Sequence, residues 1–248
     1  MAASTAALRG ITKQYKDFTL GPVDMTVPAG SIVGLIGENG AGKTTLLKIL
    51  CGVNRADDGT VDLLGGSPAD AATRAKIGVV FEDAFFYGSF TAAQVARSLA
   101  GMYGARWNAD SFSAYLRRFG LDAGKKLKEY SRGMRLKLSL AAALAHDPEL
   151  LVLDEATAGL DPVVRGELLD LFLEFIQDER HSIVMSSHIT ADLEQIADSI
   201  AYLHNGQLLF QENKDDLLQE YGVLHCGEDV LTSLPAGLVV FTRRGAYG

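Results

Sequence analysis

The chain has 248 residues, of which 48% are hydrophobic, and its formal net charge at pH 7 is −8. A chain of this length can bury a sizeable core without a metal or a disulfide, and it corresponds to one domain with a subdomain or to two small domains. Its longest uninterrupted apolar run is residues 99–105, whereas a membrane-spanning helix needs about 20 apolar residues. We therefore expect a chain that does not cross a bilayer by itself.

The acidic balance and the cysteines exclude further classes of protein. A general nucleic-acid-binding protein usually has a basic face, and no cluster of basic residues occurs here, so we expect no nucleic-acid partner. Residues 1–8 lack the pattern of a signal peptide. Cys51 and Cys226 do not have metal-ligand spacing, which indicates reduced thiols in a cytoplasmic protein.

The first third of the chain alternates short apolar runs with one helical pattern. Residues 31–36 and 77–81 are typical of strands, and residues 44–51 are typical of a helix with Cys51 as a buried thiol. The pair Asp58-Gly59 predicts a turn, with a strand after it at residues 61–64.

The middle of the chain, residues 91–145, has a helical pattern rich in Ala, Leu and Arg. Turns are predicted near Gly104 and Gly120, and Trp107 is expected to pack in the interior. Because apolar runs typical of strands lie on both sides, this segment is expected to be a helical insertion between two strands of one sheet.

The last third returns to the alternation of strands and helices. Residues 150–153 and 183–186 are continuous apolar runs typical of buried parallel strands. A helix is predicted between them at residues 163–179, and Asn205-Gly206 predicts a hairpin within residues 200–210. This alternation predicts an α/β fold with a largely parallel sheet.

A glycine-rich loop follows the first predicted buried strand. Residues 37–44, GENGAGKT, fit the pattern G-x-x-x-x-G-K-[ST] between a strand and a helix. We call residues 37–44 the phosphate loop, because glycines let backbone N–H groups approach phosphate oxygens and the following helix N-terminus favours anions. Lys43 supplies a cation for the β- and γ-phosphates, and the Thr44 hydroxyl is a ligand for Mg²⁺. A chance match is possible in a Gly-rich chain, but the context makes it rare.

Two carboxylates end the predicted strand at residues 150–153. Asp154 is placed to hold Mg²⁺, and Glu155 is placed to orient and polarise an attacking water molecule. Two solvated acids at a strand end are the alternative. The phosphate loop favours the catalytic interpretation.

Further motifs occur in a fixed order around these two. YSRGM occurs at residues 130–134, AGLD occurs at residues 158–161, and His188 follows a predicted strand. With Tyr15, the phosphate loop and Glu82, this order resembles that of the nucleotide-binding subunits of ATP-binding cassette (ABC) transporters, over about residues 5–221. The resemblance implies that residues 130–134 are the signature segment and that residues 158–161 are the loop that crosses the dimer interface, here called the dimer loop.

The resemblance implies an architecture and a division of the chain. The fold would be a P-loop NTPase core with a mostly parallel sheet, an N-terminal antiparallel β part and an inserted helical subdomain. Residues 1–221 would be one ATPase domain, with its core at residues 1–83 and 146–221 and its helical subdomain at about residues 84–145. Residues 222–248, with a candidate strand at 238–241, would be a short C-terminal extension or a truncated end.

The resemblance also implies the roles of individual residues. Glu155 and His188 would be catalytic, and Mg²⁺ would be held by Thr44, Glu82 and Asp154. The residues implied in binding ATP are Tyr15, Gly37, Asn39, Gly40, Ala41, Gly42, Lys43, Thr44, Thr45 and Glu82, together with Ser131 and Gly133 from a second chain.

Two positions depart from the family pattern. The usual signature is Leu-Ser-Gly-Gly-Gln, so Ser131 and Gly133 are kept while Arg132 and Met134 are not the common residues. Glu82 stands where most members have a glutamine. Both changes resemble a bacterial branch related to antibiotic-efflux and bacitracin-resistance transporters.

Several of these residues have a purely structural alternative. Tyr15 could be a half-buried strand aromatic, His188 a surface or capping histidine, and Ser131 a helix N-cap. The aromatic run at residues 85–87 could line a groove for a membrane subunit or pack inside the helical subdomain.

The function implied by the resemblance is a transport ATPase subunit. Two such chains, or this chain and a homologous ATPase subunit, would close head to tail around two MgATP. They would power a separate polytopic membrane permease, in the direction of export, from the cytoplasmic face of the membrane. The alternatives are a soluble ABC ATPase of translation or DNA repair and a binding-only regulator. Repair ATPases insert long coiled coils between the nucleotide motifs, and the 154 − 43 = 111 residues from Lys43 to Asp154 leave no room for them.

Overall fold

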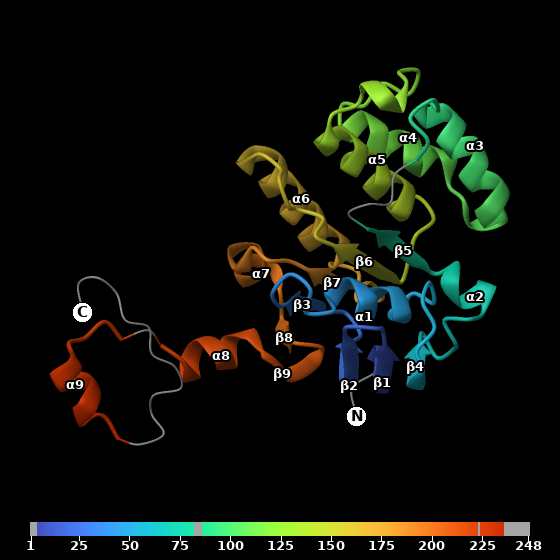
Figure 1. The fold of residues 1–248 in the computed structure, drawn as a ribbon. Helices are drawn as coiled ribbons and strands as arrows, with labels where there is room; N and C mark the ends of the chain where they lie inside the picture. Colours follow the sequence, from blue (N-terminus) through green and yellow to red (C-terminus); the bar gives the residue numbers. More distant parts are fainter. Residues whose placement is uncertain (1–3, 82–85, 223, 236–248) are drawn as a thin grey trace. The chain divides into compact units, whose positions relative to one another are not determined.

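The computed structural model describes residues 4–81, 86–222 and 224–235 of the chain, and Figure 1 shows their arrangement. The chain forms two compact units, residues 1–214 and residues 215–248. The described part of the second unit contains α9 (Glu228–Ser233) and all but the first residue of α8 (Lys214–Glu220), and neither helix has a buried residue. The candidate strand at 238–241 lies outside the described residues, and the domain boundaries predicted from the sequence stay predictions.

The first unit contains an antiparallel sheet with the strand order β2-β1-β4. Along β2, buried and more exposed residues largely alternate, as in a sheet that covers a core with one face. This is the N-terminal antiparallel part that the family resemblance implies. Its strands are β1 (Ser4–Gln14), β2 (Thr19–Pro28) and β4 (Asp58–Leu63).

The prediction of a turn at Asp58-Gly59 is wrong, because both residues belong to β4. Gly59 has φ of +91°, and the register between β1 and β4 shifts between Arg9 and Thr12. The Asp58 carboxylate accepts a hydrogen bond from the Gly59 N–H at 2.8 Å. The Asp-Gly pair therefore forms an irregularity within a strand. Gly59 has a left-handed backbone there, as it would in a turn.

The larger sheet has the strand order β5-β6-β7-β3-β8-β9. Its first five strands run parallel, and β9 pairs antiparallel with β8 through the predicted Asn205-Gly206 turn. Every residue of β6 and β7 is buried, which confirms the apolar-run prediction. The strands are β3 (Ile32–Ile36), β5 (Ile77–Val80), β6 (Leu150–Asp154), β7 (Ser182–Ser186), β8 (Ser199–His204) and β9 (Gln207–Asn213).

The helix α1 (Lys43–Leu50) packs in a core that it shares with both sheets. Leu46, Leu47 and Leu50 are fully buried there, and each contributes about 1.5–3 kcal/mol through loss of apolar surface to water. Cys51, which follows the helix, is buried as predicted. This burial fixes the start of α1, and with it the phosphate loop, on the edge of the parallel sheet.

A helical region lies between β5 and β6 and has its own apolar core, in which Val95, Phe112 and Leu138 are buried. Figure 1 shows its helices grouped beyond the end of β5. Trp107 and Phe86 pack partly buried against this core, whereas Tyr87 is 77% exposed. The helices are α3 (Ala92–Tyr103), η1 (Gly104–Arg106), α4 (Ala109–Arg118), η2 (Leu127–Glu129) and α5 (Arg132–Leu144).

Three further helices connect the strands: α2 (Ala71–Arg74), α6 (Pro162–Phe175) and α7 (Thr190–Ile196). The helix predicted at 163–179 ends earlier than expected, because the Asp178 carboxylate accepts from the Arg180 N–H and closes a tight turn before β7. Among the described residues, no helix has the length and apolar character required to span a membrane.

Candidate functional site

The phosphate loop joins the carboxyl end of β3 to α1, as the sequence predicts. A side chain at Gly37 would overlap the carbonyl oxygen of Leu203, so only glycine fits this close approach. The β8–β9 turn supports the loop from outside, because the Gly206 N–H donates to the Ala41 carbonyl at 3.0 Å. The predicted phosphate-binding residues, Gly37, Asn39, Gly40, Ala41, Gly42, Lys43, Thr44 and Thr45, thus form one continuous cradle ending in a helix N-terminus.

Lys43 points back over this loop. Its Nζ donates to the carbonyl oxygens of Gly37 and Glu38 at 2.8 and 3.2 Å, and it lies 3.5 Å from Oε1 of Glu155. The side chain is only 6% exposed. The charge of this buried ammonium is compensated by two carbonyl oxygens and one carboxylate.

Asp154 ends β6 and receives hydrogen bonds on both carboxylate oxygens. The Thr44 hydroxyl donates to Oδ2 at 2.7 Å, and the Ser186 hydroxyl donates to Oδ1 at 2.6 Å. Asp154 is 3% exposed, and a buried carboxylate without such partners would be costly. The role of Ser186 was not predicted from the sequence, although its place at the carboxyl end of a predicted neighbouring strand indicates a position close to Asp154.

Glu155 is the next residue and has a left-handed backbone, with φ of +52°. Such a conformation costs on the order of 1–3 kcal/mol for a non-glycine residue. The Ser186 side chain and carbonyl both accept from the Glu155 N–H, at 3.0 and 3.2 Å. His188 holds the carboxylate: its Nδ1–H donates to Oε2 at 2.6 Å and its backbone N–H at 3.3 Å. The strained turn therefore aims Glu155 away from β6, between Lys43 and His188.

The remaining predicted residues are spread around this centre. Tyr15 is 43% exposed, next to Phe18, and Phe18 lies against Gly42 of the phosphate loop. Ser131 is the N-cap of α5 and accepts from the Met134 N–H at 3.2 Å. Glu82 lies outside the described residues.

The signature segment packs against the dimer loop of the same chain. A Cβ at Gly133 would lie 3.6 Å from Cδ2 of Leu160. A Cβ at Gly159 would lie 3.0 Å from a guanidinium nitrogen of Arg132. The unusual Arg132 thus covers Gly159, and the signature and the dimer loop meet on one surface.

The donor set suits Mg²⁺. Thr44 and Asp154 offer hard oxygen ligands, and Mg²⁺ typically takes one or two carboxylates together with substrate phosphates. In the described part of the chain, no three His, Cys, Asp or Glu side chains gather into a metal site.

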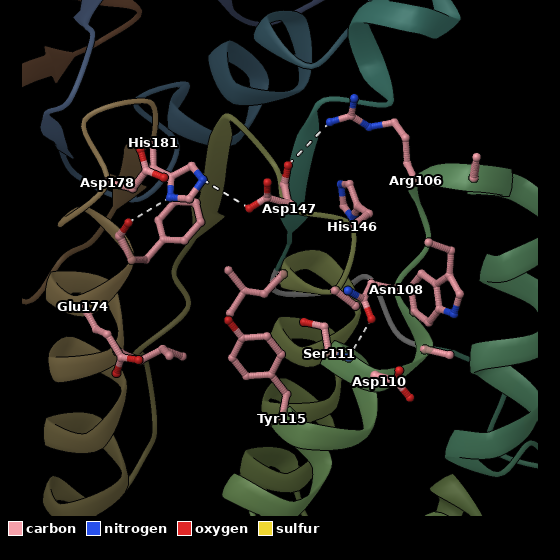
Figure 2. A pocket seen from close by; sticks show the side chains of 17 residues that line it. Arg106, Asn108, Asp110, Ser111, Tyr115, His146, Asp147, Glu174, Asp178 and His181 are labelled. Carbon is pink, nitrogen blue, oxygen red and sulfur yellow. Dashed lines mark hydrogen bonds and ion pairs between the residues drawn. The ribbon is translucent and has the colours of Figure 1, made fainter.

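A cavity of about 760 Å³ lies elsewhere, between the helical region and the end of α6 (Figure 2). His146, Asp147, Tyr115 and His181 are among its lining residues. None of the predicted ATP or metal ligands lines it. We therefore assign no part of the nucleotide chemistry to this cavity.

Comparison with known proteins agrees with the arrangement of the motifs. A family model described as "ABC transporter" matches residues 20–158. The chain is 36% identical over 212 residues to the bacitracin transport ATP-binding protein BcrA of Enterococcus faecalis, covering 84% of this chain and 68% of that protein. It is 33% identical over 211 residues to the lantibiotic transport ATP-binding protein SrtF of Streptococcus pyogenes, covering 84% and 90%.

Some relatives are considerably longer than the matched region. An uncharacterized ABC transporter ATP-binding protein of Synechocystis is 38% identical over 206 residues, and the chain spans 58% of its length. Among solved structures, an ATP-binding subunit of an ABC transporter superposes with a TM-score of 0.80 at 28% identity, over 92% of this chain and 98% of that one. A dimeric cassette bound to ADP and Pi shares the fold, with a TM-score of 0.76 at 23% identity over 84% and 98%.

Proposed function

Because the chain belongs to the ABC transporter family, we propose that it binds ATP and hydrolyses it to power transport through a separate membrane subunit. The convergence of Lys43, Asp154 and Glu155 at the carboxyl edge of the parallel sheet carries this proposal. Ligands of open α/β sheets bind at this edge. The proposal concerns this chain alone, since some relatives extend well beyond the matched length.

In the proposed reaction, Glu155 is the residue that prepares water. Its carboxylate accepts a proton as the water oxygen bonds to the γ-phosphorus and the bond from that phosphorus to the ADP oxygen breaks. His188 donates to the same carboxylate and fixes its orientation. Lys43 and the phosphate-loop N–H groups stabilise the charge that develops on the phosphoryl oxygens.

Thr44, Asp154 and Glu82 would hold Mg²⁺ in this proposal. The ion would neutralise charge shared between the β- and γ-phosphates. Asp154 would do this as a carboxylate whose orientation is set by Ser186. Tyr15 would cover the adenine, since its ring is exposed beside the phosphate loop.

A single chain would not complete the site. Ser131 and Gly133 lie at the start of α5, beside the dimer loop, and would reach the nucleotide of a second copy or of a homologous subunit. Backbone N–H groups at the start of α5 would then face the γ-phosphate. We therefore propose a head-to-tail dimer that closes over two MgATP and reopens after hydrolysis.

The membrane partner would dock on the helical region. Tyr87 and Met102 expose 77% and 79% of their surface there, the largest fractions among the large hydrophobic side chains of the described residues. The relatives named for bacitracin and lantibiotic transport favour export of a peptide antibiotic from the cytoplasmic face of the membrane. Tyr87→Ala should reduce recovery of a polytopic membrane protein with the tagged chain. The exposed Tyr221→Ala is the control.

Glu155→Gln tests the reaction. We expect the turnover of MgATP to fall about 10²–10⁴-fold, as for loss of a general base. ATP binding should remain and ATP-bound dimers should accumulate, measured by nucleotide binding and by size-exclusion chromatography. Glu149→Gln, at the residue that precedes the same strand, should change neither. Full turnover in Glu155→Gln would remove this residue from the reaction.

A further inference from the structure

One buried carboxylate lies near the site without belonging to it. Asp192 in α7 is 2% exposed, and its Oδ1 lies 3.3 Å from Nε of Arg165 in α6. Its Oδ2 has no hydrogen-bond partner among the described residues. Burying a carboxylate is unfavourable unless it is paired, and Arg165 is the cation that pairs with Asp192.

Replacing such a pair by apolar residues is often neutral or stabilising, and stability alone is therefore a poor explanation for it. The Arg165 side chain is 32% exposed and could be solvated without a buried partner, so the arginine itself does not require Asp192. What a buried pair can supply is a defined orientation of the elements that carry it.

Each of the two residues lies one helical turn from a functional segment. Asp192 follows His188 by four residues, and α7 begins two residues after that histidine. Arg165 follows Asp161 by four residues, and Asp161 ends the dimer loop and caps α6 through the Val164 N–H at 3.0 Å. The ion pair thus connects the start of α6 with the start of α7.

Packing also holds α7, which lies against both α6 and β3. The Arg165–Asp192 pair adds a directional polar contact to this packing. Leu193 packs on β3, where a Cβ at Gly34 would lie 3.0 Å from it, and this contact holds α7 to the sheet. It does not tie α7 to the dimer loop. His188 itself is 54% exposed and lies two residues before α7, so its backbone position follows α7 while its side chain contacts Glu155.

We propose that Arg165 and Asp192 are a positioning pair, which transmits the position of the dimer loop to His188 and so to Glu155. This inference rests on the proposed function, because it needs Glu155 and His188 to act on ATP. Neither Arg165 nor Asp192 touches the nucleotide. Their role is to make hydrolysis depend on the contact that the dimer loop makes with a second chain.

The test compares Asp192→Asn and Arg165→Gln with Glu167→Gln. Glu167 lies on the same helix and forms an exposed ion pair with Lys137 at 2.8 Å, so it controls for loss of a charge on α6. We expect about tenfold lower kcat in the two test variants, since small misplacements of catalytic groups have effects of this size or larger. KM for ATP should change less than about twofold, because the phosphate loop is untouched, and cooperativity between the two sites should fall.

Two further variants separate positioning from folding. Arg165→Lys keeps the charge and should restore most of the kcat, and the double variant Asp192→Asn/Arg165→Gln should be no worse than the poorer single variant. The inference is overturned if the test variants match Glu167→Gln, or if their lost kcat only follows the fraction unfolded in urea. If the proposed function itself is wrong, the unaltered chain will not hydrolyse ATP. This result is distinct from a failure of the positioning pair, which would appear only in the variants.

Discussion

Thr44 donates a 2.7 Å hydrogen bond to Asp154, although 110 residues separate them in the chain. The contact brings the first residues of α1 to the end of β6. It pairs the two described side chains that are predicted to bind Mg²⁺. The same hydroxyl therefore has two expected roles, orienting Asp154 and binding the metal.

Thr44→Val removes the hydroxyl and keeps the shape of the side chain. We expect the apparent affinity for Mg²⁺ in the ATPase reaction to fall about 10–100-fold, the usual effect of losing a partner around a metal. The measurement is the ATPase rate against Mg²⁺ concentration at saturating ATP. Thr44→Ser retains the hydroxyl and should stay near the rate of the unaltered chain. An unchanged Mg²⁺ dependence in Thr44→Val would argue against the assignment.

His188→Ala removes the donor that holds the Glu155 carboxylate at 2.6 Å. The carboxylate would remain near Lys43 but lose its orientation, so we expect kcat to fall about 10–100-fold with ATP binding retained. Single-turnover measurements separate this loss from slow product release. His188→Gln can still donate a hydrogen bond and should lose less. Equal losses in both variants would contradict an orienting role.

The parts of the site that depend on local chemistry could be predicted from the sequence. Lys43 and Thr44 occur in a loop in which a close backbone contact requires Gly37 and a left-handed backbone favours glycine at positions 40 and 42. Asp154 ends an apolar strand. Ser186 was not predicted, because its role arises only when β6 and β7 pair and Asp154 comes opposite it. The same holds for Arg165 and Asp192, whose pairing depends on the packing of two helices.

For the Asp58-Gly59 pair, the sequence correctly indicates an unusual backbone, but the turn predicted from it is wrong. The glycine does have a left-handed backbone. Because β4 pairs with β1, this backbone interrupts a strand and does not close a turn. Tertiary pairing of this kind is invisible to a window of a few residues.

Cys51 provides a test of the core around α1. Burial, with a smaller effect from the charge of Asp154, raises the pKa of its thiol to about 12. Because the thiolate is the reactive form, this thiol should not react with a disulfide reagent at pH 8 in the folded protein. We expect about one reactive thiol per native chain and about two in denaturant, and none in native Cys226→Ser. A second fast-reacting native thiol would show that the core opens.

His146 predicts how stability depends on pH. It is 2% exposed, stacks on Tyr103 at 4.2 Å, and has Nε2 3.1 Å from the Ile77 carbonyl oxygen. Burial lowers the pKa of this imidazole below its ordinary value. Below a pH of about 6.5 the unfolded chain takes up a proton that the folded chain resists, so this contribution to stability is lost as the pH falls.

The measurement is the free energy of unfolding in urea between pH 5 and 8. His146→Phe keeps a ring against Tyr103 but loses the hydrogen bond, so it should be less stable at pH 8 and show a flatter pH dependence. The exposed His225→Ala should keep the slope of the unaltered chain. A slope that is the same in all three proteins would mean that another group, and not the buried imidazole, governs stability in this range.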